Sequence, residues 1–147
     1  MSIPPNIKDT FLMSEDEVIE KVISYLRKKK YIVETANKGF AHGVDVIAYN
    51  PITASHFYIE CKGNIKNNYA VKQQFTSLQI AHHFDVQLGQ LCQVIHRYRN
   101  ERNTQFGMAS PHTLRIQNRI DAVRTALKRL PIELIWVEPK KVWIEKP

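Results

Sequence analysis

The sequence has few cysteines and no long apolar stretch. Its two cysteines, Cys61 and Cys92, are too few for a disulfide framework, and free thiols suit the reducing cytoplasm. No apolar run approaches the roughly 20 residues that a membrane-spanning helix needs. The first ten residues also lack the basic and then apolar pattern of a secretory signal. These absences argue against disulfide-scaffold and membrane proteins and predict a cytoplasmic protein.

Acidic residues are outnumbered by basic ones. The 147 residues include 21 Lys and Arg against 14 Asp and Glu, which gives a net charge of +7. Hydrophobic residues make up 44% and charged residues 24%, an ordinary balance for a single globular domain of this length. The positive charge favours a polyanionic partner, of which nucleic acid is the commonest. A basic globular protein without such a partner has the same composition.

Hydrophobic periodicity predicts the order of the elements. Residues 1–13 contain two prolines and no period, and are expected to form an arm before one domain over 14–147. Ser14, followed by acidic residues and then by apolar residues at helical spacing, predicts a helix over about 14–30. Strands are expected near 31–33, 43–49, 56–62, 104–110, 132–137 and 142–144. Helices are expected over 70–100, as one helix or as two that meet between residues 84 and 89, and over 112–130. This order predicts a mixed α/β domain.

Charged residues interrupt two of the predicted strands. Asp45 lies within an apolar run, and Glu60 and Lys62 flank Cys61 on the following strand. Because side chains alternate along a strand, Glu60 and Lys62 face the same way and Cys61 faces the other. A turn at Asn50 and Pro51 brings Asp45 close to Glu60. Charges on one face of an apolar strand are costly unless they are paired or face a cleft.

Two carboxylates and a lysine suit phosphodiester hydrolysis. Carboxylate oxygens and water are the ligands that Mg²⁺ prefers, and the bound ion polarises a phosphate and activates water. A neighbouring lysine orients that water or stabilises charge that develops on the phosphate. The alternative is a buried salt bridge in which Asp45, Glu60 and Lys62 only join two strands.

The segment GVDVIAYN…FYIECKG resembles the PD-(D/E)xK nuclease superfamily, whose members have the restriction-endonuclease-like fold. In that pattern an acidic residue precedes a second carboxylate, one further residue and a lysine, and Asp45, Glu60 and Lys62 stand at these positions. Val44 stands where the family name has proline. The likeness in element order covers about residues 14–110, and its specific part is residues 43–63. It implies an αβββαβ core with a mixed central sheet flanked by helices.

The same resemblance implies an activity and further site residues. It implies a DNA endonuclease that uses Mg²⁺, with Mn²⁺ as a substitute, acts on duplex or branched DNA and forms a homodimer. Asp45 and Glu60 are then the metal ligands, Lys62 positions water, and an acidic residue of the first helix joins them. Glu20 has the expected spacing for that role, whereas Glu15 lies nearer the centre of the apolar stripe. Members of the superfamily also place a glutamine near the site, for which the candidates are Gln73, Gln74 and Gln90.

Basic residues are candidate contacts to the DNA backbone. Those expected to bind it, together with Gln73, are Lys66, Lys72, Arg97 and Arg99. Along the later helix, Arg115, Arg119 and Arg129 fall toward one side, which fits either a phosphate-binding stripe or an ordinary exposed face. The alternatives to a nuclease are a catalytically inactive nucleic-acid-binding protein on the same fold, with a regulatory or mobile-element role, and an interaction protein. The pathway, whether restriction, repair, recombination or mobile-element control, stays open.

Overall fold

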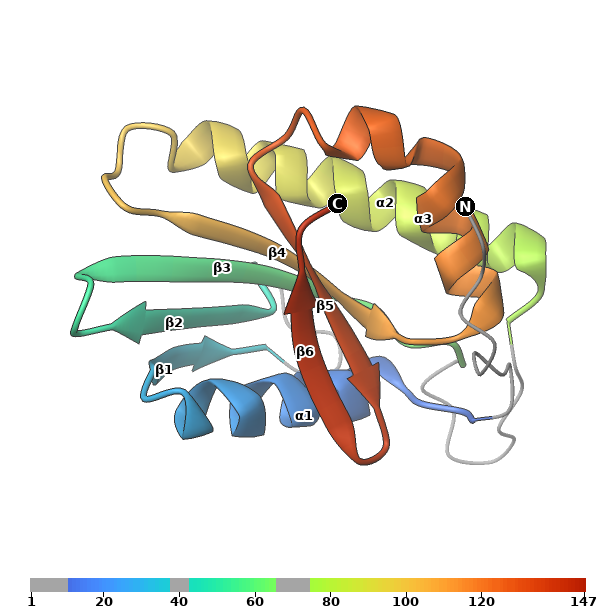
Figure 1. Cartoon of the computed structure of the whole chain (residues 1–147), viewed down its shortest axis with the longest axis horizontal. Coiled ribbons are helices and arrows are strands. Elements are labelled where there is room, and N and C mark those ends of the chain that lie inside the picture. Colours follow the sequence, from blue (N-terminus) through green and yellow to red (C-terminus); the bar gives the residue numbers. More distant parts are fainter. Residues whose placement is uncertain (1–10, 38–42, 66–74) are drawn as a thin grey trace.

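The computed structural model describes residues 11–37, 43–65 and 75–147 (Figure 1). In chain order its elements are α1 (Glu15–Lys28), β1 (Ile32–Ala36), β2 (Val46–Asn50), β3 (Ser55–Cys61), α2 (Ser77–Arg97), β4 (Gln105–Pro111), α3 (Leu114–Leu127), β5 (Ile132–Glu138) and β6 (Lys141–Glu145). The predicted α/β class and the predicted order of elements are confirmed. Within these ranges, no helix combines the length and the apolar character that crossing a membrane requires.

The six strands form one mixed sheet in the order β1-β2-β3-β4-β5-β6. Strands β3, β4 and β5 are parallel, and the other neighbouring pairs are antiparallel. Parallel neighbours need crossover connections, which α2 and α3 supply. Because such crossovers share one hand, both helices lie on one face of the sheet, and α1 covers the other face (Figure 1). The sheet is therefore the middle layer of three.

A hydrophobic core lies on each face of the sheet. Toward α1, the helix residues Val18, Ile19 and Val22 are fully buried against strand residues that include Phe57 and Ile59. Toward α2 and α3, Trp136 and its neighbours fill the second core. Helix α1 begins where the sequence predicts, with a capping box between Ser14 and Glu17. The two cores fix both helix layers against the strands that carry the charged residues.

Helix α2 is one continuous helix. Its buried face repeats at helical spacing through Ile80, Phe84, Leu91 and Val94, and this packing continues on both sides of Gly89. Gly89 is exposed, and a Cβ atom built there meets no described atom within 4 Å apart from its chain neighbours and the backbone of its own helix. The glycine therefore weakens the helix without ending it.

Gly89→Ala is expected to raise the free energy of unfolding by about 0.5–1 kcal/mol, because alanine loses less backbone entropy in a helix. Urea unfolding followed by circular dichroism measures the change. Gly107→Ala is the opposite control, because its Cβ would lie 2.8 Å from Cε1 of the buried Phe57 ring. A lower stability of Gly89→Ala than of the parent would contradict the helix geometry described.

Candidate active site

Asp45 and Glu60 face each other across two neighbouring strands. The antiparallel register pairs Val46 with Ile59, so Asp45, which directly precedes β2, stands opposite Glu60 of β3. The two carboxyl groups share a hydrogen bond. Asp45 Oδ2 also accepts a hydrogen bond of 2.7 Å from the backbone N–H of Cys61. The sequence placed these carboxyls near each other, and the strand register makes them direct neighbours.

Burial raises the pKa of both carboxyls. The pKa of Glu60 rises from 4.5 to about 8, because the group is buried and because the charge of Asp45 opposes its ionisation. Burial also raises the pKa of Asp45, while the Cys61 N–H and the hydrogen bond from Glu60 favour its charged form. The hydrogen bond between the two groups therefore favours ionisation of Asp45 and protonation of Glu60.

Lys62 connects this pair to the first helix. It follows β3, and its Nζ lies 3.5 Å from Oε2 of Glu15, the first residue of α1. Burial raises the pKa of Glu15, and the charge of Lys62 opposes that rise. The charge of Lys62 also acts on Asp45 and on Glu60. Three carboxyl groups and one ammonium group therefore form a single electrostatic cluster.

The loop after β3 holds the beginning of α1 against this cluster. A Cβ atom on Gly63 would lie 2.5 Å from both Glu15 N and Met13 O, so only glycine permits this approach. Asn64 is buried, accepts a hydrogen bond of 2.8 Å from Met13 N and donates one of 2.9 Å to Phe11 O. In the sequence these residues only mark the end of a strand. Gly63 and Asn64, directly after Lys62, are the sequence feature that indicates the close packing of α1 at this loop.

Glu20 lies elsewhere on α1. It is exposed and lines a surface hollow with Leu12, Ser24 and Pro139. Five residues separate Glu20 from Glu15, which corresponds to about 140° around the helix axis. The structure therefore brings Glu15, and not the Glu20 favoured by the resemblance, to Lys62.

Gln87 is a further residue at the cluster that the sequence did not single out. It is buried in α2, and its Nε2 donates to the carbonyl oxygens of Glu60, at 2.9 Å, and Ala109, at 3.2 Å. These hydrogen bonds hold α2 against β3 and β4 beside Glu60, one of the two candidate metal ligands. Gln90 is exposed, and the other predicted residues of this region, Lys66, Lys72, Gln73 and Gln74, lie outside the described residues.

Arg97 and Arg99 lie at the other end of α2. Ten helical residues, which span about 15 Å, separate Arg97 from Gln87. The two arginines border an exposed hollow beside Cys92. The structure therefore does not bring these two predicted DNA contacts to the carboxyl pair.

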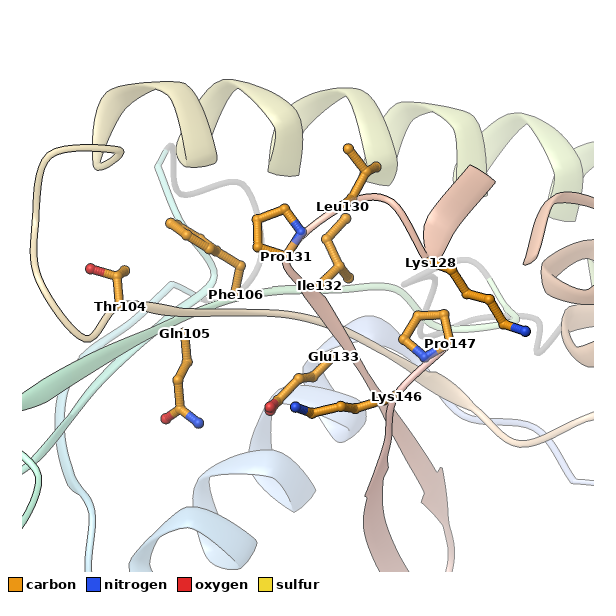
Figure 2. A pocket seen from close by; sticks show the side chains of 10 residues that line it. All are labelled: Thr104, Gln105, Phe106, Lys128, Leu130, Pro131, Ile132, Glu133, Lys146 and Pro147. Atoms are coloured by element: carbon orange, nitrogen blue, oxygen red, sulfur yellow. The ribbon is translucent and has the colours of Figure 1, made fainter. Parts of the chain in front are cut away.

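Another hollow, of about 280 Å³, lies at the opposite end of the parallel strands. It is lined by residues that begin β4 and β5, among them Phe106 and Ile132 (Figure 2). Glu133 and Lys146 point toward each other there, and burial raises the pKa of Glu133 while the lysine charge opposes the rise. In the register of β3 and β4, Glu60 pairs with Met108, farther along the strand. This hollow is separate from the carboxyl pair.

The carboxyl pair fits one hydrated divalent ion. Across the three described ranges, no group of three or more His, Cys, Asp and Glu side chains is arranged to hold a metal. Mg²⁺, however, is commonly bound by one or two carboxylates and keeps several water ligands. Where two facing carboxyl groups share a proton, a cation can bind between them in place of that proton. Asp45 and Glu60 are the side chains that would hold it.

The raised pKa of Glu60 predicts how the stability of the metal-free protein depends on pH. The folded chain binds this proton more tightly than the unfolded chain does, so its contribution is complete below pH 4.5 and is lost as pH rises to about 8. The melting temperature is therefore expected to fall between pH 5 and pH 9. In Glu60→Gln, which cannot ionise, the fall should be smaller. Thermal unfolding in a chelator-containing buffer series measures this, and identical slopes for the two proteins would refute the shared proton.

The described cluster joins two facing carboxyls, a lysine and a helix acid at the ends of two strands. Comparisons of the chain with protein-family models, with curated proteins and with solved structures give no match. The function is therefore inferred from the geometry of Asp45, Glu60 and Lys62.

Proposed function

We propose that this chain is a divalent-metal-dependent deoxyribonuclease of the PD-(D/E)xK superfamily, with a restriction-endonuclease-like core. The observation that carries the proposal is the hydrogen-bonded pair of Asp45 and Glu60, which stand opposite each other with Lys62 two residues further on. The order from α1 to β4, with β3 parallel to β4, agrees with the core that the resemblance implies. The net charge of +7 suits a DNA substrate.

Each group of the cluster has a role in hydrolysis. An Mg²⁺ or Mn²⁺ ion held by Asp45 and Glu60 would polarise the phosphodiester and lower the pKa of water. Lys62 directly follows the strand that carries Glu60, and its ammonium group would orient the attacking water and stabilise negative charge on the phosphate. Glu15 holds that ammonium group in place. The water oxygen bonds to phosphorus and releases its proton to solvent, the bond to the bridging oxygen breaks, and the leaving oxygen takes up a proton from solvent water.

Cleavage of supercoiled plasmid and of four-way branched DNA tests the proposal. We expect nicked or linear product with Mg²⁺ or Mn²⁺ and none with a chelator. Lys62→Met should lower the rate by about 100-fold, the usual scale for loss of one charge-stabilising group. Lys140→Met removes the same charge at an exposed position between β5 and β6 and should change little.

Two results would overturn this function. Cleavage that survives both Lys62→Met and Glu60→Gln would remove the cluster from the chemistry. Salt-dependent DNA binding without cleavage of either substrate would favour the inactive nucleic-acid-binding alternative. The homodimer stays a prediction from the resemblance, and light scattering after size-exclusion chromatography measures it.

A further inference from the structure

A small notch opens beside Lys62, on the face of the sheet that carries α2 and α3. Its lining includes Lys62, His83 and Gln87, together with Ser110 and Arg119. About 10 Å³ of this space is open to the centre of a water molecule. That is room for about one water molecule or one ligand oxygen. The notch therefore accepts a single atom of a ligand that lies at its mouth.

Arg119 of α3 is held at this notch with a buried donor unpaired. Its Nη2 lies 2.5 Å from Asp85 Oδ1, and its guanidinium carbon lies 5.6 Å from the centre of the Phe84 ring. The Nε atom is buried and has no hydrogen-bond partner among the described residues. A buried N–H of a charged group is costly to leave unpaired. The guanidinium group therefore has hydrogen-bonding capacity that Asp85 does not use.

Positive charge enters the notch from two elements. Lys62 lines it from the end of β3, and Arg119 lines it from α3. One helical turn before Arg119, Arg115 donates a hydrogen bond of 2.8 Å to Phe75 O, so a third cation lies on this side of α3. The carboxylate of Asp85 is more than half exposed. Two cations that face one oxygen-sized space fit an anionic oxygen, and a guanidinium group matches the geometry of phosphate.

We infer that Arg119 binds a backbone phosphate of the nucleic acid, with one phosphate oxygen in the notch between the Arg119 guanidinium group and Lys62. This phosphate neighbours the phosphodiester that is cut at Asp45 and Glu60, and that placement rests on the proposed function. The nucleic acid strand then crosses the N-terminal halves of α2 and α3. It does not follow the end of α2 that carries Arg97 and Arg99. Asp85 competes with the phosphate for the same guanidinium group.

Fluorescence anisotropy of a labelled DNA duplex, titrated in chelator at several salt concentrations, tests this contact. We expect Arg119→Gln to weaken binding and to lower the slope of log Kd against log salt by about one, the value for one lost phosphate contact. Arg27→Gln removes the same charge at an exposed position near the end of α1, on the other face of the sheet, and should change Kd less than twofold. Asp85→Asn should tighten binding, because the competing carboxylate is gone.

Equal slopes and equal affinities for Arg119→Gln and Arg27→Gln would overturn the inference. If circular dichroism shows that Arg119→Gln is unfolded, Asp85→Asn decides: tighter binding supports the inference and unchanged binding refutes it. Cleavage by the parent protein is measured in parallel with Mg²⁺. If the parent protein cleaves DNA but Arg119→Gln binds DNA no differently from the control variant, only the inference is refuted. If Arg119→Gln loses one phosphate contact but the parent protein cleaves no DNA, only the proposed nuclease function is refuted.

Discussion

Asp45→Asn is expected to lower the rate of Mg²⁺-dependent DNA cleavage by about 100- to 1,000-fold. Asparagine keeps the size of the side chain and its oxygen still accepts the hydrogen bond from Cys61 N. It loses the negative charge, so a divalent cation loses one of its two side-chain ligands and Glu60 loses its charged neighbour. Single-turnover cleavage measures the rate, and calorimetry with Mn²⁺ measures the lost affinity.

Glu34→Gln is the matched control for Asp45→Asn. Glu34 is an exposed carboxylate of β1 that lies 3.3 Å from His56 and not at the carboxyl pair. Glu34→Gln changes the net charge by the same amount as Asp45→Asn, so a general weakening of cation binding would affect both variants alike. Parent-like cleavage by Asp45→Asn, in protein free of contaminating nuclease, would contradict the assigned role of this carboxylate.

Gly63→Ala is expected to destabilise the protein by about 1–3 kcal/mol, the usual range for forced overpacking. The added Cβ would lie 2.5 Å from backbone atoms of Glu15 and Met13, so the beginning of α1 must move. The same movement takes Glu15 away from Lys62, and cleavage should fall together with stability. Urea unfolding measures the first effect, and cleavage at a temperature where the variant stays folded measures the second.

Gly89→Ala makes the same chemical change where no described atom obstructs the Cβ, so it separates crowding from a general effect of alanine. If Gly63→Ala matched the parent in both stability and cleavage, the close approach between α1 and the loop after β3 would be disproved.

The elements and the carboxyl pair were predictable because they depend on neighbours in the chain. Ser14 and the helical spacing after it place α1, and strand alternation with one turn places Asp45 near Glu60. The choice between Glu15 and Glu20 was not predictable in this way. It depends on how α1 is rotated on the sheet, and Asn64 fixes that rotation through a hydrogen bond across 51 residues of chain.

Long-range packing also explains the other residues that the sequence missed. Gln87 is buried and donates to the backbone of β3, which no periodicity of polar residues reveals. Arg119 lies in a stripe that fits an ordinary exposed face equally well in the sequence. Its position at the notch with Lys62 follows only from the packing of α3, which places the guanidinium group beside Phe84.

The most direct test of the account is the position of manganese in crystals of the metal-free protein soaked in Mn²⁺. Anomalous scattering at the manganese edge locates the ion without reference to activity. The account predicts a peak between the carboxyl groups of Asp45 and Glu60, and its loss in Asp45→Asn. A protein that cleaves DNA with Mn²⁺ but binds the ion elsewhere, with this position empty at saturating concentration, would contradict it.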